Sequence, residues 1–292
     1  MPMHARQLRW GVEKRLEFIE FRLFWEGVIN RSDLVDQFEV SVPQASNDLS
    51  RYDKLAPNNM LYDKSGKRYV RSPSFRPVLT DPSADDLLVQ LQAVGARETV
   101  ASQTWLSSTP PTDSLPTPHR VVSVDVIRAL LAAISENKAL ELHYQSMNPD
   151  HPDPIWRWIS PHAFASDGFR WHIRAYCHRD NKFKDFLLSR ILKTRNLNES
   201  QATAKGDRIW NEYLNVSLIP NPKLTESQQR AISVDYGMKG RRIDIPVRKA
   251  LLYYFKKRLR LDVADALDRP QEAPVIIENE EEFDSALKEA SA

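Results

Sequence analysis

Cysteine is almost absent from this sequence, since Cys177 is the single one among 292 residues. One cysteine cannot close an intrachain disulfide, which is typical of proteins kept in a reducing compartment. Long apolar runs are also missing, because no stretch approaches the roughly 20 residues that span a bilayer. The first residues lack the apolar core of a secretory signal. We therefore expect a cytoplasmic protein that does not bind membranes.

Glycine is also rare, and the net charge is small. Eight glycines leave little material for phosphate-binding loops, and the motifs G-x-S-x-G, H-E-x-x-H and C-x-x-C are all absent. Seven histidines are scattered without the spacing of metal ligands or of a nucleophile and its base. We therefore expect no enzyme, no metal site and no cofactor. A formal net charge of +2 means that any nucleic-acid affinity must come from local patches.

The sequence does contain a three-helix pattern at its N-terminal end. Apolar residues recur at helical spacing over 11–28, which predicts an amphipathic helix. Asn30 and Asp33 signal a short second helix, and Ser41 followed by Gln44 is a capping-box pattern that opens a third. The buried stripe of the third helix is expected to comprise Val42, Ala45, Leu49 and Tyr52.

Residues 60–71, MLYDKSGKRYVR, predict two short strands around a polar turn. Three helices and a hairpin describe a winged helix-turn-helix domain over residues 1–80. Polar side chains on the third helix suit base edges, and cations in the hairpin suit phosphates. The residues predicted to contact DNA are Ser41, Pro43, Gln44, Ser46, Asn47, Ser50, Arg51 and Lys54, with Lys64, Lys67 and Arg68 in the hairpin. Small three-helix units also serve as protein-interaction domains, so this alternative stays open.

Composition divides the rest of the chain into a linker and two further domains. Residues 81–120 are predicted to be a helical linker, with a helix capped by Ser83 before a Pro/Ser/Thr-rich stretch. Residues 121–204 combine one helix with several short strands and tight turns, which favours a small β-barrel. Residues 205–292 alternate strand and helix patterns and predict an α/β dimerisation domain. The chain is thus expected to be an α+β multidomain protein.

The most informative strands lie between residues 170 and 191. A period of two places Phe169, Trp171, Ile173, Ala175 and Cys177 on one face, and Arg170, His172, Arg174, Tyr176 and His178 on the other. Two guanidiniums, two imidazoles and a phenol on one face suit phosphates, planar bases or acidic groups. An ordinary solvated sheet face would show the same alternation.

Charge is unevenly distributed near the C-terminal end. Between Lys239 and Arg260, nine basic residues accompany a single acidic one, Asp244. Acidic residues gather just beyond, at Glu278, Glu280, Glu281, Glu282 and Asp284. The basic segment could contact nucleic acid, or it could pair with the acidic tail of a partner subunit.

Residues 159–191, ISPHAFASDGFRWHIRAYCHRDNKFKDFLLSRI, resemble the core of a WYL domain, an Sm-like barrel that binds ligands in bacterial regulators. The tripeptide that names the WYL family reads Trp171-His172-Ile173 here. Residues 42–69, VPQASNDLSRYDKLAPNNMLYDKSGKRY, resemble the winged helix that accompanies this domain. Taken in order, these features resemble the transcriptional repressors of anti-phage defence operons, the CapW/BrxR type.

The resemblance implies a homodimer that binds double-stranded operator DNA at an inverted repeat and represses its own defence operon. It further implies release by a nucleic-acid-like or nucleotide effector bound at the WYL domain. The implied effector pocket comprises Tyr144, Ser146, His162, Trp171, His172, Arg174, Tyr176, Ser189 and Arg190. Arg174 and Arg190 would hold phosphate, while His172 and Tyr176 would stack on a base or hydrogen-bond to it.

Two other classes of function remain as hypotheses. In one, the barrel binds single-stranded nucleic acid and the winged helix makes protein contacts. In the other, the protein is an enzyme acting on nucleotides, which the missing metal and nucleophile motifs disfavour.

Overall fold

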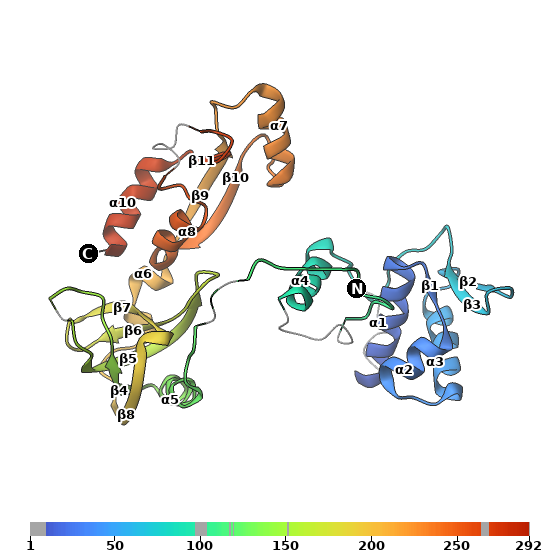
Figure 1. Cartoon of the computed structure of the whole chain (residues 1–292), viewed down its shortest axis with the longest axis horizontal. Helices are drawn as coiled ribbons and strands as arrows, with labels where there is room; N and C mark the ends of the chain where they lie inside the picture. Colours follow the sequence, from blue (N-terminus) through green and yellow to red (C-terminus); the bar gives the residue numbers. More distant parts are fainter. Residues whose placement is uncertain are drawn as a thin grey trace. The chain divides into compact units, whose positions relative to one another are not determined.

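The computed structural model describes residues 10–96, 104–116, 118, 120–150, 152–263 and 269–291 (Figure 1). The chain forms two compact units, Met1–Thr117 and Pro118–Ala292. No helix in these described ranges is long and apolar enough to cross a membrane.

Residues 10–71 of the first unit form three helices and a small antiparallel sheet, as the sequence predicts. Its elements are α1 (Trp10–Trp25), β1 (Val28–Ile29), α2 (Arg31–Phe38), α3 (Val42–Leu55), β2 (Met60–Asp63) and β3 (Arg68–Arg71). The strands lie in the order β1-β3-β2. The hairpin β2–β3 is confirmed. The first helix ends at Trp25, earlier than the predicted residue 28, and Val28 begins a third strand, β1, that the sequence pattern did not predict. Leu16, Phe18, Leu34, Leu49 and Tyr52 belong to the core that joins the helices.

The turn between α2 and α3 sets the position of the third helix. Glu39 closes α2 with a φ of 53°, a left-handed conformation that costs a non-glycine residue about 1 kcal/mol. The hydroxyl of Ser41 then accepts a hydrogen bond from the Gln44 amide, so Ser41 caps α3 as predicted. Val42 is 55% exposed, and its predicted place in the buried stripe is wrong because it lies in the solvent-facing first turn.

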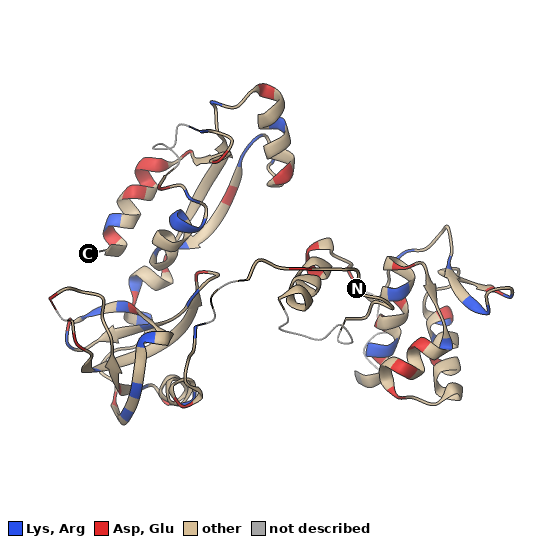
Figure 2. Cartoon of the chain, viewed as in Figure 1, with Lys and Arg blue, Asp and Glu red and all other residues tan. Residues whose placement is uncertain are grey.

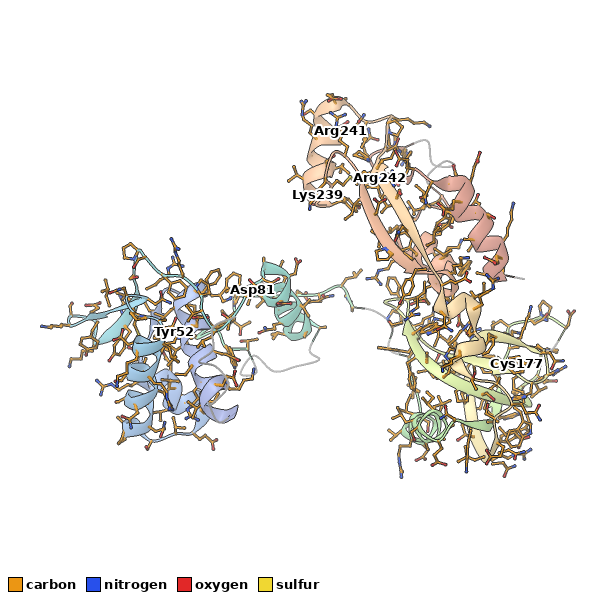
Figure 3. The ribbon with its side chains drawn as sticks, turned by 180° about the vertical axis from the view of Figure 1, so that it is seen from behind. Tyr52, Asp81, Cys177, Lys239, Arg241 and Arg242 are labelled. Carbon is orange, nitrogen blue, oxygen red and sulfur yellow. The ribbon has the colours of Figure 1, made fainter. Side chains whose placement is uncertain are left out.

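A buried carboxylate ties the end of the winged helix back to α1. Glu20 accepts hydrogen bonds from the backbone amides of Val78, Leu79 and Thr80 and from the hydroxyl of Tyr52 at 3.0 Å. Burial and the negative charge of Glu20 raise the pKa of Tyr52, whose ring lies among the helices of this unit (Figure 3). Glu20 thereby pairs three consecutive backbone amides at once.

The predicted linker also contributes to the first unit. Ser83 caps α4 (Ala84–Gly95) through the Asp86 amide, as its position in the sequence predicts. Trp105, which comes after α4, packs edge-on against Phe18 and Phe21 of α1. The chain therefore returns to the helical core before it enters the second unit.

The second unit begins with α5 (Val124–Ser135), which packs on one face of a five-stranded antiparallel sheet. The strands are β4 (Lys138–Tyr144), β5 (Ile155–Ser166), β6 (Trp171–Cys177), β7 (Lys182–Leu187) and β8 (Ile191–Glu199). They lie in the order β7-β6-β5-β4-β8. Among the described residues no pairing joins the edge strands β7 and β8, so the predicted closed Sm-like barrel is not confirmed.

The C-terminal part of this unit combines a second sheet with several helices. Its elements are α6 (Arg208–Asn211), β9 (Tyr213–Pro220), α7 (Glu226–Asp235), β10 (Ile243–Arg248), α8 (Leu252–Arg258), β11 (Val275–Ile277) and α10 (Glu280–Ser291). The strand order is β10-β9-β11. Phe283 of α10 and Leu252 of α8 are fully buried against this sheet. The predicted alternation of strands and helices after residue 240 is confirmed.

Candidate functional site

The outer face of α3 carries the side chains that the sequence assigns to DNA contact. Among them, Ser41, Pro43, Asn47, Ser50, Arg51 and Lys54 are exposed, and Gln44 and Ser46 are half-buried. The apolar residues of α3, Ala45, Leu49 and Tyr52, all face the core, so its outer face is polar.

Hydrogen bonds divide this face into engaged and unengaged groups. The Ser46 and Ser50 hydroxyls each donate back to a helix carbonyl four residues earlier, at 3.0 Å. In contrast, the structure shows no hydrogen bond or ion pair for the side chains of Asn47, Arg51 and Lys54 within the described ranges. Positions 47, 51 and 54 follow the i, i+4, i+7 spacing of a single helical stripe. One amide and two cations are therefore left available to a partner along that stripe.

A buried ion pair beneath this stripe fixes the helix against α1. Asp48 is 1% exposed and accepts a hydrogen bond from Arg15 Nε at 2.6 Å. The side-chain Nε2 of Gln44 also donates to Asp48, at 3.0 Å, so this side chain is engaged with Asp48 and not free for a capping box with Ser41. Asp48 is a positioning residue that sequence reasoning missed, because its buried place in a polar run becomes visible only once α1 is packed beside it.

The tip of the hairpin presents cations to solvent. Lys64 and Lys67 are exposed, and Lys67 adopts a φ of 49°. Asp63 accepts hydrogen bonds from the Ser65 and Gly66 amides at 3.0 Å, which shape the turn. These amides, chiefly that of Gly66, hold the pKa of Asp63 below its ordinary value. Arg68 pairs with Asp63 at 3.5 Å, so the two lysines are the freer cations of the three predicted contacts.

In the second unit, the polar face of β6 is covered by the C-terminal region of the chain. His172 and Arg174 are 5% and 6% exposed, respectively, so the interpretation as a solvated sheet face is wrong. On the opposite face Ile173, Ala175 and Cys177 are fully buried, whereas Phe169 and Trp171, which the alternation places on the same face, are exposed. The chain fills both sides of this strand.

Asp207, the cap of α6, is the centre of that covered face. Its carboxylate accepts hydrogen bonds from Arg174 Nε at 2.7 Å and Arg174 Nη2 at 3.1 Å, and lies 3.0 Å from His162 Nε2. Burial alone would raise the pKa of Asp207, but the hydrogen bonds from His162 and Arg174 outweigh it and set the pKa at about 2. Asp185 adds a second carboxylate, 3.3 Å from Arg174. Arg174 is thus fully engaged by its own chain.

A second carboxylate, Asp167, organises the turn between β5 and β6. It accepts hydrogen bonds from the Phe169 and Arg170 amides and from Arg170 Nε, and lies 3.3 Å from His172 Nε2. Burial by itself raises the pKa of Asp167, but these hydrogen bonds outweigh it and hold the pKa at about 2. The ring of Tyr254, from α8, lies 4.7 Å from the ring of His172.

The remaining residues of the implied pocket are not gathered around Asp207. Tyr144 lies in the core on the α5 side of the sheet, and its hydroxyl accepts from the Leu187 amide. Trp171 is 57% exposed. Tyr176 is half-buried and lies edge-on to Phe183. Ser146, Ser189 and Arg190 are half-buried near the ends of β4 and β7. The structure therefore brings together His162, His172 and Arg174, and Tyr176 lies near them because Phe183 contacts both Tyr176 and His162. In the part of the chain that the structure describes, no hydrogen bond, ion pair or ring contact joins the other predicted residues to this group.

The basic segment before and within α8 pairs largely with acidic residues of the same chain. Arg242 contacts Glu278 and Lys256 contacts Asp284, while Arg241 contacts Glu226. Blue and red stretches of the ribbon both occur in this part of the chain (Figure 2), and Arg241 and Arg242 lie at the turn that precedes β10 (Figure 3). This pairing within the chain supports neither predicted role of the basic segment, contact with nucleic acid or contact with the acidic tail of a partner subunit.

Comparison with known proteins gives each part of the chain a counterpart. Family models match the BrxR transcriptional regulator winged helix-turn-helix domain over residues 11–93, the WYL domain over 125–195, and the BrxR C-terminal dimerization domain over 213–283. Three curated relatives are each named DNA-binding transcriptional repressor CapW. The protein from Escherichia coli strain KTE188 is 39% identical over 96% of this chain and 93% of its own.

The chain belongs to the CapW family. The Stenotrophomonas maltophilia relative is 38% identical over 98% of this chain and 95% of its own, and the Pseudomonas aeruginosa relative is 37% identical over 96% and 93%. The names of these CapW proteins describe a regulatory and not a catalytic role, which agrees with the prediction that the chain is no enzyme. A solved structure of PafBC from Arthrobacter aurescens aligns with 15% identity and a TM-score of 0.25, over 100% of this chain and 51% of that one, which decides nothing.

Proposed function

We propose that this CapW-family protein is a homodimeric, cytoplasmic transcriptional repressor that reads duplex operator DNA with α3. The observation that supports the proposal most is the stripe formed by Asn47, Arg51 and Lys54, which is exposed and unengaged within the described residues. Arginine and asparagine make bidentate contacts with guanine and adenine in the major groove. The buried pair of Asp48 and Arg15 holds this stripe in place, as specific recognition requires.

The hairpin extends the same surface. In a winged helix the recognition helix enters the major groove, and neighbouring cations contact the flanking backbone. Lys64 and Lys67 are suited to that backbone role. The match to a C-terminal dimerization domain supports a dimer. Such a dimer would present two of these helices to an inverted repeat whose half-sites lie one helical turn or a multiple apart.

We further propose that the repressed genes form a phage-defence operon and that an anionic, nucleic-acid-like effector releases the DNA. The effector would act at the covered face of β6. Because Asp207 and Asp185 occupy Arg174, an incoming phosphate must displace a carboxylate there. Asp207 caps α6, which leads directly into β9 of the matched dimerization region. Displacing Asp207 would therefore bias the geometry of the dimer.

Fluorescence anisotropy with the DNA upstream of the protein's own gene tests the DNA-binding part. We expect tight binding to this duplex at moderate salt and at least tenfold weaker binding to a shuffled duplex of the same length. Equal affinity for both duplexes would contradict the proposal. Preference for random single strands would favour instead the hypothesis of a single-strand-binding module.

A further inference from the structure

A cleft of about 300 Å³ lies between the β5–β6 turn and α8, away from Asp207. Four cations line it: Arg120 from the segment before α5, Arg170 from the turn, and Lys257 and Arg258 from α8. Phe169 and Tyr254 supply aromatic walls. Asp167 is the single acidic residue among the lining residues.

The carboxylate of Asp167 is already paired within the chain. Its oxygens accept hydrogen bonds from two backbone amides and from Arg170. Lys257 has its own partner in Asp262. For Arg120 and Arg258 the structure shows no carboxylate partner within the described parts of the chain. The cleft therefore keeps an excess of positive charge from two guanidiniums that lack a counter-ion.

Arg258 is held in the cleft by a feature of the turn itself. Its Nη1 donates to the Asp167 carbonyl at 2.9 Å, and its guanidinium lies 5.9 Å from the centre of the Phe169 ring. Gly168 has a φ of +88°, and a Cβ atom at this position would lie 1.2 Å from Arg258 Nη1. Only glycine leaves room for the guanidinium against this turn.

A second hollow of about 410 Å³ continues from the first, since it shares Asp167, Tyr254 and Arg258. Its other walls include the apolar side chains Val247, Leu251 and Phe255. Arg258 and Tyr254 thus stand between a basic hollow and an apolar one. Together the two hollows are in the size range of small-molecule sites, which combine apolar walls with a few polar groups that orient the ligand.

We propose that these two hollows form a binding site for a phosphate monoester attached to a planar base, either a free nucleotide or the 5′ end of an oligonucleotide. Arg258 and Arg120 would bind the phosphate, because guanidinium forks match its oxygens. The base would lie against Tyr254 and the apolar wall beyond it. This is a second site, separate from the covered face of β6 where the effector is proposed to act, and it also lies outside the pocket that the family resemblance implies. It rests on the proposed sensing function for its regulatory role.

Isothermal titration of the full-length protein tests this site with four probes: adenosine, adenosine 5′-monophosphate, a deoxyadenosine dinucleotide and the same dinucleotide with a 5′-phosphate. We expect one or both phosphorylated probes to bind at least tenfold more tightly than their unphosphorylated counterparts. Whichever phosphorylated probe binds identifies the source, free nucleotide or strand end. Failure of both phosphorylated probes to bind, or equal binding with and without phosphate, would overturn the proposal.

Two pairs of variants locate the bound phosphate. Arg258→Ala should weaken binding at least tenfold, whereas Arg230→Ala, an exposed arginine of α7, should not. Gly168→Ala should also weaken binding by displacing Arg258. Gly237→Ala is its control, because Gly237 has a φ of +61° and nothing within 4 Å of an added Cβ.

The alternative site gives a distinguishable result. If Arg190→Ala abolishes binding while Arg258→Ala leaves it unchanged, the ligand occupies the pocket implied by the family resemblance and this proposal is wrong. Operator binding is measured separately by anisotropy. A protein that binds phosphorylated probes but no duplex would contradict the proposed repressor and leave the site intact.

Discussion

Single buried charges position both candidate surfaces of this protein. Asp48 lies under the DNA-facing stripe, and Asp207 lies under the covered face of β6. Each is nearly inaccessible and each holds an arginine. Removing one partner of a buried pair leaves an uncompensated charge, which is costlier than losing an exposed ion pair.

The first prediction concerns Asp48. Asp48→Ala should lower the free energy of unfolding by about 3 kcal/mol, because Arg15 and Gln44 lose their shared acceptor. Urea denaturation checks this value. The matched control is Asp53→Ala on the exposed side of the same helix, which should change stability by less than about 0.5 kcal/mol. Equal effects of the two substitutions would show that Asp48 does not anchor α3.

The second prediction concerns Asp207 and pH. Its pKa of about 2 lies below the ordinary value near 3.8, so its contribution is present above pH 4 and is lost as the pH falls towards 2. Asp207→Asn should therefore cost at least about 2 kcal/mol at pH 7, and the difference from wild type should shrink between pH 4 and pH 2. Urea titrations at several pH values measure it, with Asp235→Asn at an exposed position as the control. A difference that does not depend on pH would contradict this role.

Sequence reasoning reached local features of these residues but not their distant partners. The period of two placed Ile173, Ala175 and Cys177 on one face, since alternation is encoded within one strand, and that face is buried there. It did not report that Phe169 and Trp171, assigned to the same face, are exposed. The burial of Arg174 depends on Asp207, which is 33 residues away in the sequence, and no local pattern reports that contact. The exposed stripe of α3 was predictable because helical spacing is local in the sequence. The burial of Asp48 was not, because it depends on packing against Arg15 of α1.

At the scale of elements, α3 and the hairpin should contribute differently to DNA binding. Arg51→Ala should weaken operator binding by about 1–3 kcal/mol and relax the sequence preference, because a base contact is lost. Lys67→Ala should weaken binding to all duplexes alike and reduce the slope of log K against log salt by about 1. Anisotropy titrations at several salt concentrations distinguish the two. The assignment of helix and wing fails if both variants behave alike.

Elements with strong local signals were predictable, and those defined by pairing were not. Ser41 and Ser83 mark the starts of α3 and α4 because capping needs only neighbouring residues. The strand β1 has two residues and exists only through its pairing with β3. The expected barrel depends on closure between β7 and β8, which the observed pairing does not provide. Strand order is a property of tertiary contacts, which the alternation pattern does not encode.

At the scale of the whole molecule, the proposed repressor must be a dimer. Sedimentation velocity at micromolar concentration should give about twice the chain mass of 33.7 kDa. High salt should not dissociate the dimer, because the basic segment around Arg241 and Arg242 is paired within its own chain and is therefore not needed to bind a partner subunit. A monomer in low salt would remove the basis for reading an inverted repeat.

DNase I footprinting of the purified protein on the DNA upstream of its own gene tests the proposed repressor most directly. We predict two protected half-sites in inverted orientation, with centres one helical turn of about 34 Å or a whole multiple apart. Arg51→Ala should require a protein concentration at least about fivefold higher for the same protection, as a loss of about 1–3 kcal/mol implies. The absence of a footprint, a single half-site, or an unchanged footprint with Arg51→Ala would contradict the assignment of α3 as the element that reads DNA.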